Sequence, residues 1–186
     1  MKRLFDLTLV IVAATILALP IVLAWLAVRL TSEGPAIFWS DRVGRDSKIF
    51  RMPKFRSMRE GAPALATHLL RNPNAYLTPL GSFLRRSSLD ELPQLWSIFK
   101  GDMSLIGPRP ALFNEYQLIK LRKRLKVDRL LPGLTGWAQV NGRDELTTPQ
   151  KVALDLEYMQ RRSVGFDLYI LWLTVLKVIS RDNVSH

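Results

Sequence analysis

The longest apolar stretch of the chain lies close to its N-terminus. Residues 7–28 hold no charged side chain and are bounded by Asp6 and Arg29. As one straight helix, at ~1.5 Å per residue, this stretch would extend ~33 Å, which is enough to cross the ~30 Å hydrocarbon core of a bilayer. A small-x-small cleavage site followed by a neutral mature start is not visible, which disfavours a cleaved signal peptide. The pattern therefore predicts a membrane segment.

Pro20 interrupts this segment, because proline has no N–H to bond the carbonyl of Ile16. Two interpretations follow: a kinked helix that spans the bilayer, or a re-entrant helix-break-helix whose ends lie on one side. Basic residues flank both ends, and such flanks favour the cytoplasmic side. A spanning helix would place one basic flank outside, so we favour the re-entrant form. We expect a membrane segment at 1–30 and a catalytic domain at 31–186 on the cytoplasmic face.

Shorter patterns follow the membrane segment. Residues 38–45 and 48–58 resemble two short strands around a hairpin loop at 44–47. Residues 90–100 place apolar side chains at helical spacing, and the helix is expected to end at Gly101. Four apolar residues define this spacing: Leu92, Leu95, Trp96 and Phe99.

The second half of the chain alternates between predicted loops and helices. Residues 101–110, rich in glycine and proline, should be loop, and residues 131–143 are turn-rich. Residues 111–130 predict a helix whose basic face is either solvated or attracted to anionic lipid. Helices are also expected at 150–162 and at 166–179, the latter too short to span and lying either at the membrane interface or in the core.

These elements predict an α+β fold that is mostly helical. A re-entrant membrane helix and a small β-hairpin would accompany interfacial amphipathic helices around a compact catalytic domain. The length of 186 residues allows one domain with a modest core.

Charge and composition narrow the function. The 27 Lys and Arg against 16 Asp and Glu give a net charge of +11, which suits nucleic acid, an anionic membrane or a phosphorylated substrate. The absence of cysteine excludes disulfides, thiolate metal sites and cysteine nucleophiles. His68 and His186 share no motif, which disfavours a histidine metal site or a Ser-His triad. Aromatic residues gather in apolar segments and not among the basic runs, which disfavours nucleic acid.

An acidic pair, Asp90-Glu91, stands out in this basic chain. One interpretation is structural, because Ser88 and Glu91 match a capping box and acids suit a helix N-terminus. With Ser88 as cap, however, Pro93 would be the fifth helical residue and cost a backbone bond. A helix start near Asp90 places Pro93 in the first turn, where no bond is lost.

The second interpretation is chemical. A carboxylate can attack phosphorus and form an acyl phosphate, and a neighbouring carboxylate can hold Mg²⁺, which offsets the charge of a diphosphate. Basic side chains in turn-rich segments could contact the remaining phosphate oxygens. These are Lys54, Arg56, Arg85, Arg86, Arg109 and Arg143.

Taken together, the motifs resemble those of the bacterial sugar transferases, the small monotopic phosphoglycosyl transferases. The hydrophobic run with its proline belongs to the pattern, and the motifs occur in family order over almost the whole chain. They are KRLFD (2–6), KFRSM (54–58), SSLDELPQLW (87–96), GDMSLIGPRP (101–110) and PGLTGWAQVNGR (132–143).

This resemblance implies a ping-pong reaction at the cytoplasmic face of a bacterial inner membrane. Asp90 would attack the β-phosphate of a UDP-sugar, release UMP and carry the phosphosugar until polyprenyl phosphate accepts it. Glu91 would work with Mg²⁺ in the same site. By motif position, four residues would line that site: Lys54, Arg109, Arg143 and Asp167.

One local departure concerns the membrane break, where Leu19 stands in place of the serine expected before Pro20. A serine hydroxyl could satisfy a carbonyl freed by the proline, and Thr15 is the candidate substitute. The large multi-span N-terminal domain of bigger relatives is also missing, so we expect the minimal catalytic form.

Two other functions stay open at this stage. The chain could be a non-catalytic, membrane-anchored basic module that binds anionic lipid. Alternatively, Asp90 and Glu91 could bind a metal for direct attack by the lipid phosphate, without a covalent step. The sequence leaves the sugar, the glycan pathway and the oligomeric state open, a homo-oligomer included.

Overall fold

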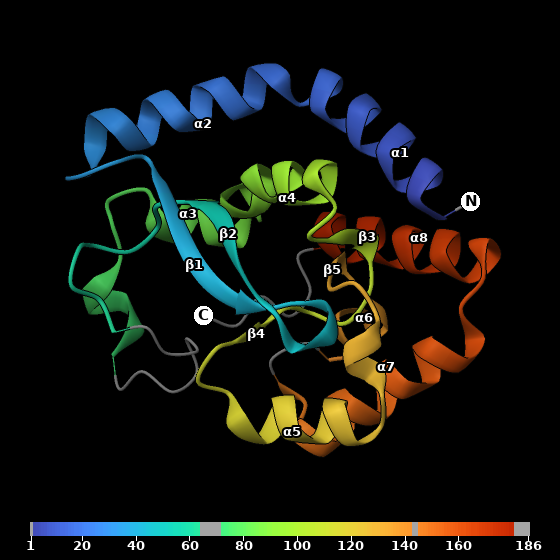
Figure 1. Cartoon of the computed structure of the whole chain (residues 1–186). Coiled ribbons are helices and arrows are strands. Elements are labelled where there is room, and N and C mark those ends of the chain that lie inside the picture. Colours follow the sequence, from blue (N-terminus) through green and yellow to red (C-terminus); the bar gives the residue numbers. More distant parts are fainter. Residues whose placement is uncertain (1, 64–71, 143–144, 181–186) are drawn as a thin grey trace.

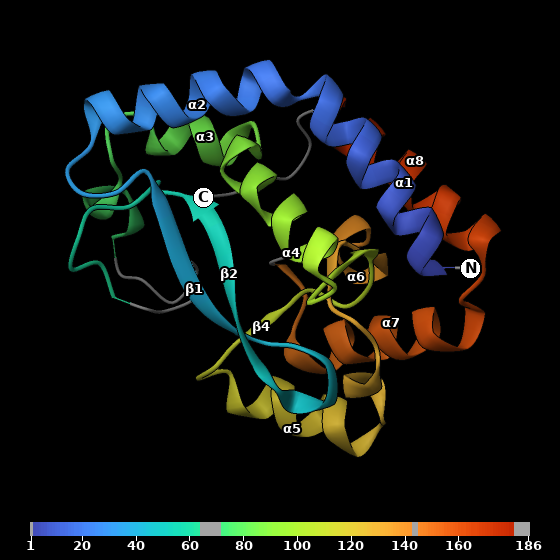
Figure 2. The same ribbon diagram turned by 45° about the horizontal axis from the view of Figure 1, so that its top comes forward.

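A bent pair of helices lies across one side of the molecule, over helix α4 (Leu95–Lys100) and beside helix α8 (Val164–Ser180) (Figures 1 and 2). The computed structural model describes residues 2–63, 72–142 and 145–180. The pair consists of α1 (Lys2–Ile16) and α2 (Ala18–Thr31), whose axes differ by 63°. No described helix is by itself long and apolar enough to cross a membrane, whereas these two reach that length and composition together.

The break between α1 and α2 falls at Leu17, one turn before the predicted position at Pro20. Pro20 is the third residue of α2, where a missing N–H disrupts no bond within that helix. Because proline has no N–H, Pro20 donates no hydrogen bond to the carbonyl of Ile16, the last residue of α1. The proline therefore causes the break in the turn that precedes it.

Thr15 does not replace the missing serine. Its hydroxyl donates to the carbonyl of Ile11, 2.9 Å away, within the same helix. The single hydroxyl proton of Thr15 is thus used within α1 and not at a carbonyl freed at the break.

The predicted hairpin is confirmed and gains a third strand. Strand β1 (Ile37–Val43) pairs antiparallel with β2 (Ile49–Phe55), and a short 3₁₀ turn, η1 (Arg45–Ser47), joins them. Strand β4 (Ala111–Leu112) pairs with the other edge of β1, giving the order β2-β1-β4. This third strand carries the segment after Pro110 to the hairpin, an arrangement that local sequence does not reveal.

The expected helix at 90–100 consists of two parts. A 3₁₀ helix, η4 (Leu89–Gln94), leads into α4 (Leu95–Lys100), which ends at Gly101 as predicted. Gly101 adopts a φ of 97°, which glycine tolerates without the usual Cβ strain. The predicted apolar face is partly wrong, because Trp96 and Phe99 are about half exposed and stack on each other.

Two further predictions are corrected in the second half of the chain. The segment 101–110 contains strand β3 (Ser104–Ile106), which pairs in parallel with β5 (Gly133–Thr135). The segment 111–130 is not one helix but β4, then α5 (Tyr116–Arg124), then η5 (Val127–Arg129). Tertiary pairing of β4 with β1 overrides the helical pattern there.

The remaining elements complete the described chain. The expected helices at 150–162 and 166–179 are confirmed as α7 (Thr148–Arg161) and α8 (Val164–Ser180). Shorter helical pieces are η3 (Pro73–Tyr76), α3 (Gly81–Arg86) and α6 (Trp137–Val140). Helix α5 lies at the opposite end of the molecule from α1 and α2 (Figure 1), which favours the solvated interpretation of its basic face.

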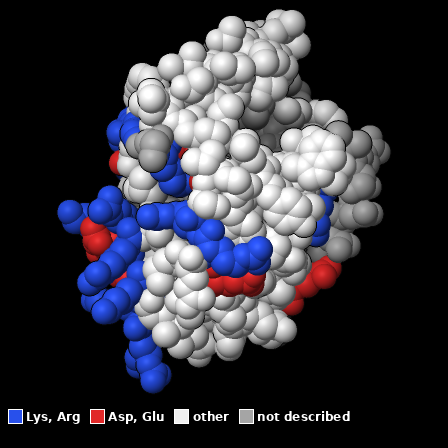
Figure 3. Space-filling model, turned by 90° about the vertical axis from the view of Figure 1, so that its right-hand side faces the viewer, with Lys and Arg blue, Asp and Glu red and all other residues white. Residues whose placement is uncertain are grey.

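Helix α8 packs one face into the core and leaves the other face exposed. Phe166 and Ile170 are buried in the main core, which Val10 of α1 and Ile98 of α4 also join. The opposite face of α8 exposes large apolar side chains, as do α1 and α2. The upper part of the molecule in Figure 3 is correspondingly almost free of charged side chains.

Candidate active site

The acidic pair lies on η4, next to strand β2, on which Lys54 stands. Ser88 precedes this helix in a left-handed conformation, with a φ of 56°, and its side chain makes no capping hydrogen bond. The capping-box interpretation is therefore wrong. A non-glycine residue in this conformation costs on the order of 1–2 kcal/mol, and such strain is frequent at functional sites. Ser88 turns the chain from α3 into η4 and so directs the pair towards the sheet.

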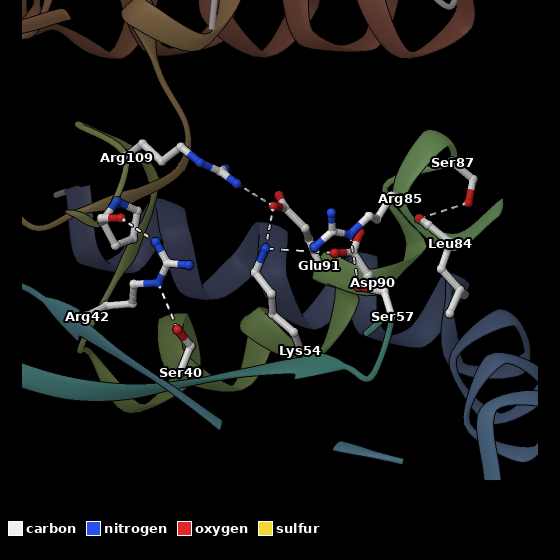
Figure 4. A network of polar contacts seen from close by, with 11 residues as sticks. Ser40, Arg42, Lys54, Ser57, Leu84, Arg85, Ser87, Asp90, Glu91 and Arg109 are labelled. Carbon is white, nitrogen blue, oxygen red and sulfur yellow. Dashed lines mark hydrogen bonds and ion pairs between the residues drawn. The ribbon is translucent and has the colours of Figure 1, made fainter. Parts of the chain in front are cut away.

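The two carboxylates have different partners (Figure 4). Glu91 Oε1 lies 2.9 Å from Lys54 Nζ and 2.8 Å from Arg109 Nη2. Asp90 Oδ2 lies 3.8 Å from the same Lys54 ammonium. Glu91 therefore carries the short ion pairs, whereas Asp90 faces the cations at longer range.

Burial makes Asp90 unusual. Its side chain is 9% exposed, and desolvation raises the pKa of this carboxyl above its ordinary value. Lys54 acts in the opposite direction, Glu91 raises the pKa further, and Arg85 and Arg109 lower it. Burial, together with Glu91, raises the pKa of Asp90 by more than the cations lower it, so the ionised carboxylate is energetically unfavourable in this site. Binding of a further cation, or formation of a bond to the carboxylate, would remove this penalty.

Asp90 opens into a cavity of about 690 Å³. Its wall includes Lys54, Arg85 and Arg109, and it extends along β1 and β2 to the start of α6. The volume lies within the range of ~300–1,000 Å³ that is usual for small-molecule sites. A buried carboxylate therefore faces a space lined with cations and large enough for a nucleotide-sized ligand.

A buried ion pair holds the loop that presents Arg109. Arg122 of α5 contacts Asp155 of α7 at 2.7 Å and donates from Nη1 to the main-chain carbonyl of Arg109 at 2.7 Å. Nearby, Gly107 and Gly133 approach so closely that a Cβ on Gly133 would lie 2.1 Å from the Gly107 nitrogen. Glycines at these two positions thus allow β3 and β5 to lie close together, just before the loop that carries Arg109.

Two other predicted basic residues of the site are Arg56 and Arg143. Arg56 lines the cavity, but its Nε donates to the carbonyl of Pro35 at 2.7 Å and its Nη1 lies 3.4 Å from Glu60. Arg143 lies outside the described residues. The structure therefore brings Lys54 and Arg109 to the acidic pair and leaves Arg56 in the wall.

Asp167 lies at the contact between α8 and α1. Lys2 Nζ lies 2.6 Å from its Oδ2, and the hydroxyl of Tyr158 donates to its Oδ1 at 2.8 Å. Asp167 is not among the residues that line the 690 Å³ cavity. These contacts make Asp167 an anchor between α8 and α1, and its expected contact with substrate stays a prediction.

The KRLFD motif forms the rest of that anchor. Asp6 is 1% exposed, accepts from the hydroxyl of Ser104 at 2.8 Å and from the Leu105 amide at 3.3 Å. Arg3 donates to the last carbonyls of α4, those of Ile98 and Phe99. The motif therefore fixes the bent helix pair, α1 and α2, to the part of the chain that carries the acidic pair.

Several residues that line the cavity were not predicted, and Arg42 and Gln139 are two of them. Arg42 was not among the predicted site residues, yet it lines the cavity. Gln139 also lines it, and neither of its buried amide atoms has a hydrogen-bond partner in the described part of the chain. Only the pairing of β1 with β2 and β4 places Arg42 here, so no local signal could have found it.

This geometry accompanies a sequence match over nearly the whole chain. Residues 1–181 match the family described as bacterial sugar transferase. The chain belongs to that family. It is thus a member of a transferase family, as its motifs indicated, and its acidic pair lies in a motif that carried the resemblance.

The relatives include short and long proteins. The chain is 38% identical to an uncharacterized sugar transferase, EpsL, of Bacillus subtilis, over 100% of this chain and 90% of that protein. It is 41% identical to the UDP-glucose:undecaprenyl-phosphate glucose-1-phosphate transferase of Escherichia coli, over 95% of this chain but 40% of that protein. It is 36% identical to the undecaprenyl-phosphate galactose phosphotransferase of Salmonella typhimurium, over 98% and 41%.

Proposed function

We propose that the protein transfers a sugar-1-phosphate from a UDP-sugar to polyprenyl phosphate, with release of UMP. The observation that carries this proposal is the buried carboxylate of Asp90, which opens into a large cavity beside Lys54 and Arg109, while the neighbouring Glu91 forms ion pairs with both cations. The undecaprenyl-phosphate transferases among the relatives support the lipid acceptor. The product would serve as the first membrane intermediate of a glycoconjugate.

The proposed reaction has two steps. A carboxylate oxygen of Asp90 bonds to the β-phosphorus while the bond from that phosphorus to the bridging oxygen breaks, and UMP takes the electron pair. An oxygen of polyprenyl phosphate then bonds to the same phosphorus, and the Asp90 carboxylate leaves. The longer contacts of Asp90 suit the nucleophile, and the short ion pairs of Glu91 suit a fixed partner.

Mg²⁺ is the proposed cofactor, and adjacent carboxylates suit its preference for oxygen ligands. Within the described residues, no group of three or more His, Cys, Asp or Glu side chains could hold a metal ion. Asp90 and Glu91 would therefore hold the ion together with substrate phosphate and water. When bound, it would offset the charge of the diphosphate.

Substitution of the pair tests the function. Asp90→Asn should abolish transfer, and Glu91→Gln should reduce it by roughly 10²-fold or more, the scale of a lost general catalytic group. Asp102→Asn is the matched control, because that carboxylate pairs with Lys100 at the surface. Normal turnover by Asp90→Asn would overturn the proposal.

A second measurement separates covalent from direct transfer. Wild-type protein is incubated with labelled UDP-sugar and without lipid, and the label bound to protein is measured. We expect one sugar phosphate on Asp90 and release of UMP. No bound label, with UMP release strictly dependent on lipid, would instead support direct transfer.

The proposed location is the cytoplasmic face of a bacterial inner membrane, with 1–30 as a re-entrant segment and 31–186 as the catalytic part. The 63° bend and the apolar outer face of α1 and α2 support this topology. Tags at the N-terminus and at residue 186 should react from the same side. Labelling from opposite sides would refute the re-entrant arrangement.

A further inference from the structure

Arg42 lines the cavity, and the proposed reaction assigns it no role. It lies on β1, where its Nε donates to the hydroxyl of Ser40 at 3.0 Å and its Nη1 to the carbonyl of Pro110 at 3.3 Å. Figure 4 shows its guanidinium pointing towards the space between Arg109 and Lys54. Its two partners are neutral oxygens, and it forms no ion pair with a carboxylate in the described part of the chain.

The surroundings of Arg42 favour an anion. Burial and the neighbouring charge of Arg109 lower the pKa of this guanidinium to about 10, although Glu115 and Glu91 act in the opposite direction. Two guanidinium groups that face one cavity repel each other, and a partly buried cation without a paired anion is costly. An oxyanion between Arg42 and Arg109 would remove both penalties.

The position of this anion relative to Asp90 suggests its identity. In Figure 4, Arg42 and Arg109 lie on one side of the acidic pair, and Arg85 lies on the other. In an in-line displacement at phosphorus, the leaving group departs from the face opposite the nucleophile. When the phosphosugar leaves Asp90, the attacking lipid phosphate must approach from that same face.

We propose that Arg42 and Arg109 form one phosphate subsite, which binds the phosphate of the departing UMP and then the phosphate of the lipid acceptor. The inference rests on the proposed two-step function. Both ligands are phosphate monoesters, so one pair of guanidinium forks can serve each in turn. Arg42 thereby becomes a substrate-binding residue of both half-reactions.

Binding of UMP and of uridine separates a phosphate contact from a general effect on the cavity. We expect Arg42→Met, in the full chain, to weaken UMP binding on the order of tenfold or more and to leave uridine binding unchanged, because uridine lacks the phosphate. Arg45→Met is the matched control, since Arg45 is exposed at the hairpin tip and outside the cavity. Unchanged UMP affinity would overturn the subsite.

The half-reactions test the shared use of the subsite. UMP release from UDP-sugar without lipid and transfer from the preformed phosphosugar protein to polyprenyl phosphate are measured separately. We expect Arg42→Met to slow both steps, and slowing of only one would overturn the shared subsite. Arg42→Lys, which keeps the charge, should restore part of each rate and covers the case in which the methionine variant does not fold.

These readouts also distinguish the two proposals. If the wild-type protein performs neither half-reaction, the proposed function fails, whatever Arg42 does. If the wild-type protein turns over and Arg42→Met matches it in UMP binding and in both rates, the proposed function stands and the subsite fails.

Discussion

At the scale of single residues, Asp90 combines burial with reactivity. Its neighbours include Lys54 and Arg85, yet desolvation is the largest influence and raises its pKa. A carboxyl with a raised pKa in the fold contributes stability while it is protonated and loses that contribution as pH rises through the raised value. The ionised form that the reaction needs is thus the form that the fold tolerates least.

Asp90→Asn should therefore be more stable than the wild type at neutral pH. We expect the difference in melting temperature to grow as pH rises above 3.8, the ordinary value of the carboxyl, and to reach the order of a few degrees. Thermal unfolding of both proteins at several pH values checks this. A gap that is constant or shrinks with rising pH would contradict it.

A substitution of Asp155 tests whether the ion pair with Arg122 supports the loop that carries Arg109. Asp155→Asn leaves Arg122 buried without its anion, which should lower the free energy of unfolding by ~3–5 kcal/mol. Because Arg122 also holds the Arg109 carbonyl, activity per folded molecule should fall as well. Denaturant unfolding and turnover measure the two effects. Glu157→Gln on α7, whose partly exposed carboxylate pairs with Arg161, is the control, and an equal loss there would remove the special role of Asp155.

At the scale of elements, the bend between α1 and α2 follows from backbone chemistry. Proline at position 20 cannot supply the amide for the last carbonyl of α1, and Leu17 takes up the change of direction. Leu19, in place of the expected serine, does not prevent the break. The anchors of α1, through Lys2 and Asp6, and the packing of α2 hold the two arms in place.

Pro20→Ala should straighten the pair, because it restores that amide. Spin labels on Leu4→Cys and Leu30→Cys, two exposed positions in a chain without cysteine, would report an increased distance by pulsed electron resonance. Leu19→Ala changes no backbone amide and should leave the distance unaltered. An unchanged distance in Pro20→Ala would mean that packing, and not proline, sets the bend.

At the scale of the whole molecule, apolar and charged surfaces are segregated. Large apolar side chains are exposed on α1, α2 and α8, and the basic residues of α5 lie at the other end (Figures 1 and 3). An exposed apolar surface of this kind marks a membrane or partner contact. Its continuity with the bent helix pair favours a membrane.

Fluorescent labels can locate the membrane surface. A label on Trp172→Cys of α8 should be quenched by spin-labelled lipid severalfold more than one on Tyr116→Cys of α5, although both positions are well exposed in the structure. Quenching is measured in vesicles that contain the full chain. Equal quenching at the two positions would contradict an orientation with α8 towards the bilayer.

The sequence by itself determined the local features of this protein. The uncharged run with Pro20, the β-hairpin, the helix that ends at Gly101 and the acidic pair all depend on residues close together in the chain. Backbone chemistry and side-chain periodicity act over one or two turns, so a single sequence suffices for them. The order of the motifs added the family.

Only the tertiary structure decided which of these features meet. It made β4 a strand by pairing it with β1. Because β1 lies about 70 residues away in the chain, local sequence could not predict this pairing. It brought Arg42 and Arg109 to the wall of one cavity, and it paired Asp167 with Lys2. Charge pairing and burial depend on neighbours in space, and a residue with an obvious charge in the sequence has no assigned partner until the chain has folded.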